Sequence, residues 1–102
     1  MRLFGLVIFG LALTVTAPAS AYTVKGALEC PQAIEEDGHE QYREYNKWWL
    51  LGYFTARNYN GDADVGRDIE DDTIYSLALS FCKQNPANDW DDAAMDTYNR
   101  LQ

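Results

Sequence analysis

The side chains with the clearest capacity for chemistry are carboxylates, and they are densest between residues 60 and 72, NGDADVGRDIEDD. Four oxygen-bearing side chains fall on positions 1, 3, 5 and 9 of a calcium-binding loop: Asn60, Asp62, Asp64 and Asp68. Position 6 would be Val65, where that loop needs a glycine, and position 12 would be Asp71 in place of a glutamate. The pattern favours a solvated surface loop. Asp62, Asp64 and Asp68 remain a weak calcium candidate, and no metal is predicted.

A catalytic centre would need a nucleophile or a metal beside an acid or base. His39 is the one histidine in the chain, and it precedes Glu40 near the start of an expected helix. No nucleophile motif G-x-S-x-G, no glycine-rich phosphate loop and no H-E-x-x-H metal motif accompanies it. Carboxylates are too abundant for any pair of them to indicate glycoside hydrolysis. The sequence therefore predicts a protein that is not an enzyme and that needs no cofactor.

Cys30 and Cys82 are the only two cysteines. A zinc site or a redox pair is poorly supported, because the chain has no C-x-x-C motif and a single histidine. In an oxidising compartment the simplest outcome is one disulfide between them. It would close a loop of 52 residues, which the chain-entropy model values at about 4 kcal/mol, and it would tie the amino-terminal segment to a later helix.

Tryptophan and tyrosine together supply ten residues, a content typical both of small packed cores and of binding surfaces. Most of them fall at helical spacing, which favours core packing. Trp48, Tyr53 and Tyr75 lie off the main apolar stripes. These three are the candidate contacts for a partner protein.

The stretch from Tyr42 to Tyr59 must position most of these aromatic side chains. One stripe recurs in steps of three and four: Tyr42, Tyr45, Trp49, Gly52, Ala56 and Tyr59. Further apolar side chains fall on its other faces: Trp48, Leu50, Leu51 and Phe54. A helix that is apolar nearly all round must be buried on most sides. We therefore expect a buried central helix over about residues 39–58, with a homodimer through one of its faces as a further hypothesis.

Two later helices and a short early turn complete the expected fold. Pro31 suits the first turn of a short helix, and Asn60-Gly61 ends the central one. Asp71 or Asp72 is expected to cap a helix over residues 73–84. Five apolar residues would form the inner face of this helix: Ile74, Leu77, Ala78, Phe81 and Cys82. Asp89, with Asp92, is expected to begin a last helix with four inward residues: Trp90, Ala94, Tyr98 and Leu101. No strand-like alternation occurs, so we expect an all-α bundle of three to four helices with one disulfide.

The amino terminus has the features of an export signal. Arg2 precedes an apolar run over residues 3–15, and small residues at Ala19 and Ala21 fit cleavage after Ala21. Residues 1–21 are predicted to be a signal peptide and residues 22–102 a single small domain in the periplasm or outside the cell. Without Arg2 the chain has 7 basic and 16 acidic residues. This acidity disfavours nucleic acids and anionic membranes as partners.

Several short motifs together suggest a family. These are an early cysteine, an aromatic helix carrying Leu51-Gly52-Tyr53 and ending Asn58-Tyr59-Asn60, an aspartate-containing loop, and Phe81-Cys82-Lys83-Gln84-Asn85-Pro86 before an alanine-bearing last helix. Over roughly residues 30–101 the chain resembles the small periplasmic HdeA/HdeB-like proteins. That resemblance implies an all-helical fold with a disulfide between Cys30 and Cys82. A weaker resemblance is to the immunity proteins that neutralise peptidoglycan hydrolases delivered by type VI secretion.

The two resemblances imply two kinds of protein binding. Members of the first family include acid-stress chaperones, which open at low pH and bind unfolding clients. Protonation of 16 carboxylates would turn this acidic chain strongly positive, which is compatible with such a switch. The alternative is an immunity-type inhibitor that binds one secreted cell-wall hydrolase at neutral pH. In both cases the expected partner is a protein.

Overall fold

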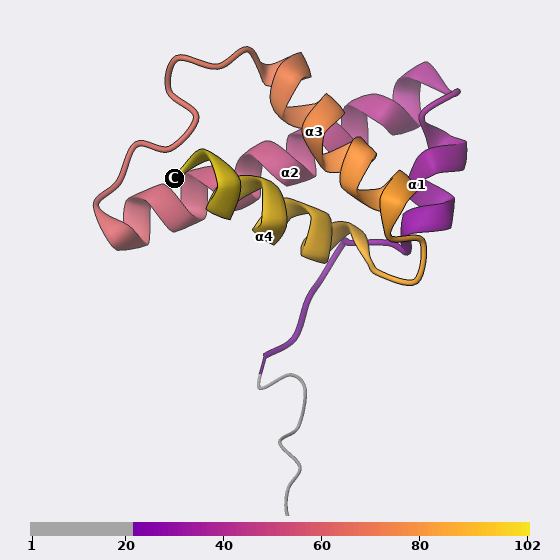
Figure 1. The fold of residues 1–102 in the computed structure, drawn as a ribbon, viewed down its shortest axis with the longest axis horizontal. Coiled ribbons are helices and arrows are strands. Elements are labelled where there is room, and N and C mark those ends of the chain that lie inside the picture. Colours follow the sequence, from indigo (N-terminus) through magenta and orange to yellow (C-terminus); the bar gives the residue numbers. More distant parts are fainter. Residues whose placement is uncertain (1–21) are drawn as a thin grey trace, which may run out of the picture.

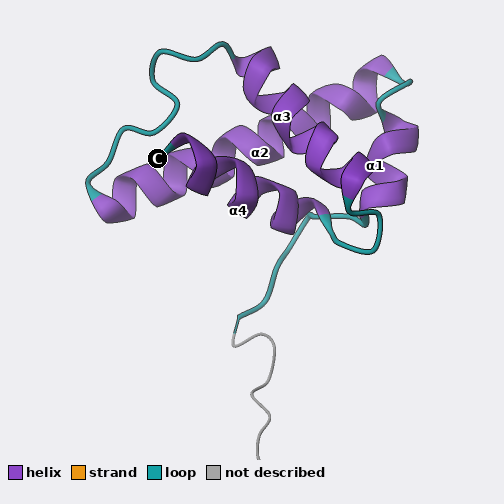
Figure 2. Cartoon of the chain, in the orientation of Figure 1, coloured by secondary structure: helices purple, strands orange, loops and turns teal. Residues whose placement is uncertain are grey.

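The computed structural model describes residues 22–102, and the predicted signal peptide lies outside them. Four helices follow one another within this range: α1 (Cys30–Glu36), α2 (Glu40–Gly61), α3 (Asp71–Gln84) and α4 (Trp90–Leu101). Figures 1 and 2 show α3 and α4 packed against the long α2, with α1 beside one end of α3. No residue from 22 to 102 belongs to a strand, so the all-α prediction is confirmed.

The central helix is not buried on most sides, and this expectation is wrong. α2 buries only Asn46, Leu50 and Phe54, at a regular spacing of four residues. Asn46 takes an inner position because its polar groups are satisfied there. Its Nδ2 donates to Glu36 at 3.0 Å, and its backbone carbonyl accepts the indole N–H of Trp90 at 3.1 Å. A polar residue therefore faces the core, and several aromatic residues of α2 face solvent.

The disulfide between Cys30 and Cys82 is present and joins the start of α1 to the end of α3. Both cysteines are completely buried. Five side chains of α3 are buried: Ile74, Tyr75, Ala78, Leu79 and Cys82. Tyr75 and Leu79 take the inner positions expected for Leu77 and Phe81. Leu77 is exposed and Phe81 is half-buried. The predicted inner face of α3 is therefore confirmed at Ile74, Ala78 and Cys82 and wrong at Leu77 and Phe81.

The residue expected to precede the helix is wrong for α3 and right for α4. Glu70, and neither Asp71 nor Asp72, is the residue that precedes α3, and its side chain makes no capping hydrogen bond. Asp89 does precede α4, and its backbone N–H donates to the carboxylate of Asp92 at 3.0 Å. This is one half of a capping box. Trp90, Ala94 and Tyr98 are buried as expected, and Leu101 is half-buried.

The loop over residues 62–70 is tied to the helices. Asp62 ends α2 in the left-handed conformation with φ 52°. Asn58 then holds Val65 by two hydrogen bonds, accepting from its N–H at 3.0 Å and donating to its carbonyl at 3.1 Å. The hydroxyl of Tyr98 donates to the same Asn58 at 2.7 Å. One amide side chain thereby connects α2, the loop and α4, and the acidic loop is an ordered part of the fold.

The segment before α1 crosses α2 and the start of α4. The indole N–H of Trp49 donates to the carbonyl of Lys25 at 2.8 Å, and the backbone N–H of Trp90 donates to Leu28 at 2.7 Å. Gly26 has φ +85°, and an added Cβ there would lie 2.9 Å from the Trp49 ring. None of the helices between residues 22 and 102 is long and apolar enough to span a membrane.

Candidate functional site

The side of α2 that faces away from the other helices carries an unusual set of residues. We call it the outer face and define it by seven exposed residues: Tyr42, Tyr45, Trp48, Gly52, Thr55, Ala56 and Tyr59. Trp48 is 60% exposed and Tyr59 is 86% exposed. None of the seven carries a charge, although the chain is strongly acidic. Exposed aromatic side chains grouped on one neutral face are characteristic of protein interaction sites.

The three basic residues of the same helix, Arg43, Lys47 and Arg57, contact other parts of the chain. Arg43 donates to the carbonyl of Asp37 at 3.0 Å. Lys47 pairs with Glu44 at 3.1 Å and with Asp72 at the start of α3 at 2.8 Å. The guanidinium of Arg57 lies 4.0 Å from the centre of the Tyr98 ring. The three basic side chains of α2 are thus engaged by the fold, and none of the seven residues of the outer face is charged.

Contacts along the outer face order its first half. The rings of His39 and Tyr42 meet edge to face at 6.1 Å, and those of Tyr42 and Tyr45 do so at 6.3 Å. Gln41 donates to the hydroxyl of Tyr45 at 2.7 Å. Such contacts reduce the entropy lost when the side chains are fixed by a partner. These aromatic residues therefore form a preorganised surface.

Gly52 lies at the centre of the outer face and has no evident role in the fold. It is in the interior of a helix, where glycine is unfavourable by roughly 0.5–1 kcal/mol relative to alanine. A Cβ at this position would meet no atom within 4 Å. Packing within the chain therefore does not require the missing side chain. A glycine would be required at this position if the backbone of another protein approached the helix closely.

Gly52→Ala should raise the free energy of unfolding by about 0.5–1 kcal/mol, because alanine removes the helix penalty without creating a clash. Urea unfolding followed by far-UV circular dichroism at pH 7 measures this. The matched control is Gly66→Ala. Gly66 has φ +88°, and an added Cβ would lie 3.2 Å from Ile74, so this variant should lose stability. Destabilisation by Gly52→Ala would show that the fold itself needs glycine at position 52.

A hollow of about 290 Å³ opens beside Trp48, between α2 and the loop over residues 62–70. We call it the Trp48 hollow. Trp48, Leu51 and Thr55 line it from α2, and Asp64, Arg67 and Asp71 line it from the loop and the start of α3. Arg67 pairs with Asp64 at 3.0 Å. The hollow is thus lined both by an exposed tryptophan from α2 and by carboxylate residues from the loop and from α3.

The three aromatic residues predicted to contact a partner have different environments. Trp48 is exposed on the outer face, as expected. Tyr53 is half-buried, stacked on Trp49 with ring centres 6.3 Å apart. Tyr75 is buried, and its hydroxyl donates to Asp37 at 2.7 Å. Burial, followed by this hydrogen bond, raises the pKa of Tyr75. Tyr75 is therefore a core residue and not a surface contact, which corrects the prediction.

The weak calcium candidate is not assembled among the described residues. Asp62, Asp64 and Asp68 are all exposed, Asp62 has the left-handed backbone that ends α2, and Asp64 is paired with Arg67. Within residues 22–102 the group of carboxylates close enough for a shared ion is a different one. The linear match to a calcium loop failed because the backbone turns at Asp62 and at Gly66, not at the loop's sixth position.

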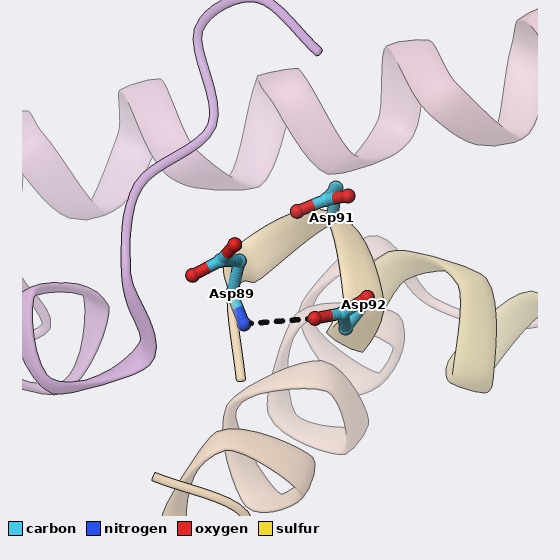
Figure 3. Close-up of side chains that lie close together, drawn as sticks. All are labelled: Asp89, Asp91 and Asp92. Atoms are coloured by element: carbon cyan, nitrogen blue, oxygen red, sulfur yellow. Dashed lines mark hydrogen bonds between the residues drawn. The ribbon is translucent and has the colours of Figure 1, made fainter. Parts of the chain in front are cut away.

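That group comprises Asp89, Asp91 and Asp92 at the start of α4, with oxygens within 4.8 Å of one another. Figure 3 shows Asp92 bonded to the backbone nitrogen of Asp89, a hydrogen bond in which Asp91 takes no part. Asn88 also donates to Asp92 at 3.1 Å. Negative charges are stabilising at a helix amino terminus, so capping explains the group. Burial, then the neighbouring Asp92 and Asp89, raise the pKa of Asp91.

Asp91→Asn should make the free energy of unfolding depend less on pH between pH 4 and pH 7. Because the folded-state pKa of Asp91 is raised, its stabilising contribution is present in acid and is lost as the pH rises through that pKa. The variant should therefore gain stability relative to the wild type between pH 4 and pH 7, by less than ~1 kcal/mol. Urea midpoints at the two pH values measure it. A relative loss over the same interval would contradict the assigned environment of Asp91.

Comparison with protein-family models, with curated proteins and with solved structures gives no match to this chain.

Proposed function

We propose that this chain is an exported protein-binding domain that engages one protein partner, in its folded state at neutral pH, through the outer face of α2. The observation that carries the proposal is the neutral aromatic face with Gly52 at its centre. Aromatic side chains supply much of the binding energy of protein interfaces, and charged residues are depleted at their cores. An inhibitor of a secreted hydrolase is one protein of this kind.

Support for a folded binding state comes from the connections around the outer face. Asn58 links α2 to the loop and to α4, and the disulfide links α1 to α3. The aromatic surface is already exposed in this folded structure, so binding needs no acid-induced opening. Support for export comes from the signal-like sequence of residues 1–21 and from the disulfide, because disulfides persist mainly in oxidising compartments.

Site-specific photocrosslinking in the producing cell tests the proposal. The photoreactive residue p-benzoylphenylalanine replaces Trp48 in one variant and Ser76, an exposed residue of α3, in a matched control. Irradiation should give one discrete protein adduct from position 48 at neutral pH and none from position 76. Equal adduct patterns at both positions, or no adduct from the outer face, would refute a specific interface there.

An acid-activated chaperone is the second candidate. It is favoured by the one ion pair between helices in the described residues, Lys47 with Asp72. The hydrogen bond from Lys47 lowers the pKa of Asp72 below its ordinary value. Its contribution is therefore present above the unfolded-state pKa and lost as the pH falls through the folded-state one. Aggregation of an unstable client at pH 3 and at pH 7 discriminates: protection in acid alone favours the chaperone.

A further inference from the structure

The Trp48 hollow combines the two features that bind a basic side chain. An exposed indole offers its ring face to a cation and its edge to an aliphatic stem. Trp48 and Leu51 line the hollow from α2, and Asp64 and Asp71 line it from the loop and from the start of α3. Within the described residues no ion pair engages Asp71, whereas Asp64 is shared with Arg67. The carboxylate of Asp71 is thus available to a second cation.

The charge around the hollow reinforces this preference. Residues 62–72 contain six carboxylates and one basic residue, Arg67. Lys47, from α2, neutralises one of the carboxylates by pairing with Asp72. The remaining charge in this region is negative, and it borders the neutral outer face on the side of Trp48. A partner with basic groups at the rim of its interface would be attracted by this potential and correctly oriented by it.

Arg67 shows that a guanidinium can pair with a carboxylate at the edge of the hollow. Its side chain lines the hollow and pairs with Asp64 at 3.0 Å, although both groups are well exposed to solvent. An exposed pair of this kind is worth little, so a partner's cation can compete for the same carboxylates. The chain's own arginine is therefore an internal competitor, and its removal should strengthen the binding of an external cation.

We propose that the partner is a basic protein, and that one of its lysine or arginine side chains enters the Trp48 hollow between Trp48 and Asp71. This inference rests on the proposed function of the outer face and specifies the chemistry of its partner. A second copy of this chain is the less favourable occupant. Each mature copy would carry 16 acidic against 7 basic residues, so two copies repel each other where a basic partner is attracted.

A peptide titration tests the inference without knowledge of the partner. Three blocked heptapeptides have the same sequence except at two adjacent inner positions. Both of these positions hold arginine in the first peptide, its neutral isostere citrulline in the second and glutamate in the third. Binding is followed by ¹H–¹⁵N correlation spectra of the full mature chain. The three indole N–H signals are internal reporters, because those of Trp49 and Trp90 are bonded to the carbonyls of Lys25 and Asn46. The Trp48 indole, on the exposed surface, should be the one that shifts.

The arginine peptide should shift the Trp48 indole and the backbone signals of Asp64 and Asp71 in a saturable way. The citrulline and glutamate peptides should bind at least about fivefold more weakly, and the arginine peptide should weaken as salt rises from about 20 to 200 mM. Asp64→Asn/Asp71→Asn should reduce the affinity by about fivefold to tenfold. Arg67→Gln should increase it by about twofold or more, since the competitor is gone.

The charge-matched control is Glu35→Gln/Asp96→Asn, which removes two carboxylates from α1 and α4, outside the residues that line the hollow. It should leave the arginine peptide's affinity within about twofold of the wild type. Three results would overturn the inference: no shift of the Trp48 indole, equal binding of the citrulline peptide, or shifts centred on Asp89, Asp91 and Asp92.

The failures of the two proposals are distinguishable. If the arginine peptide does not bind in the hollow but position 48 still crosslinks to a protein in the cell, the basic partner is refuted and the binding face is retained. If the arginine peptide binds and no protein crosslinks, the proposed function fails while the hollow's preference for cations stands. Self-association detected by sedimentation, with crosslinks between identical chains, would identify a second copy as the occupant and overturn the basic partner.

Discussion

Replacing Trp90 by alanine is expected to lower the free energy of unfolding by about 4 kcal/mol, a large part of the total stability of a domain this small. Trp90 is completely buried at the start of α4, and its ring packs on Tyr75 with centres 5.8 Å apart. The substitution leaves a cavity and also removes the indole donor from the carbonyl of Asn46. Urea unfolding at pH 7, followed by far-UV circular dichroism, measures the loss.

Trp48→Ala is the matched control for Trp90→Ala, because it deletes the same side chain from the exposed outer face. Its free energy of unfolding should stay within about 0.5 kcal/mol of the wild type, as for most surface substitutions. Equal losses in the two variants would mean that Trp48 is a structural residue. The outer face would then lose its main candidate for a partner contact.

The Cys30→Ala/Cys82→Ala double variant should also lose up to about 4 kcal/mol, because the bridge removes the closure entropy of a long loop from the unfolded chain. The two cysteines are 52 residues apart, and both are completely buried. Without the bridge, α1 is held mainly by its packing on α3 and α2 and by its backbone bond from Cys30 to Asn88. Amide hydrogen exchange should therefore accelerate most in α1. A urea midpoint equal to that of the oxidised wild type would contradict this role.

Local signals predicted much of the fold. Asp89 with Asp92 three residues later indicates the start of α4, and the spacing of Trp90, Ala94 and Tyr98 predicts three of its five buried residues. The pairing of Cys30 with Cys82 needed only an oxidising compartment and the absence of a third cysteine. These features depend on neighbours in sequence or on counting, so no tertiary information was needed.

The orientation of α2 could not be predicted in the same way. Its apolar and aromatic residues fall on several faces, a pattern that predicts burial on most sides, although Tyr42, Tyr45 and Tyr59 prove to be exposed. The stripe that faces the core contains Asn46, whose burial depends on Glu36 and Trp90 from other helices. A usable signal was present nonetheless. The basic residues Arg43, Lys47 and Arg57 are absent from the outer face, and each of them contacts another element.

The candidate site was predicted only in part for the same reason. A position off the main apolar stripes predicts exposure correctly for Trp48, but the same criterion fails for Tyr75, which is buried against Asp37. The hollow beside Trp48 depends on the path of the loop over residues 62–70, which is set by the two bonds between Asn58 and Val65. A hydrogen bond between a helix residue and a loop residue produces no periodic pattern in the sequence from which it could be predicted.

Gly52→Leu should leave the fold stable and block the binding of a partner to the outer face. Leucine is a strong helix former, and a Cβ at position 52 meets no atom within 4 Å on this exposed face, so the variant should be at least as stable as the wild type. Its bulk should nevertheless block a partner that approaches the helix closely. With p-benzoylphenylalanine at position 48, Gly52→Leu is predicted to abolish the protein adduct formed in the cell at neutral pH. An undiminished adduct from this stable variant would contradict binding through the outer face.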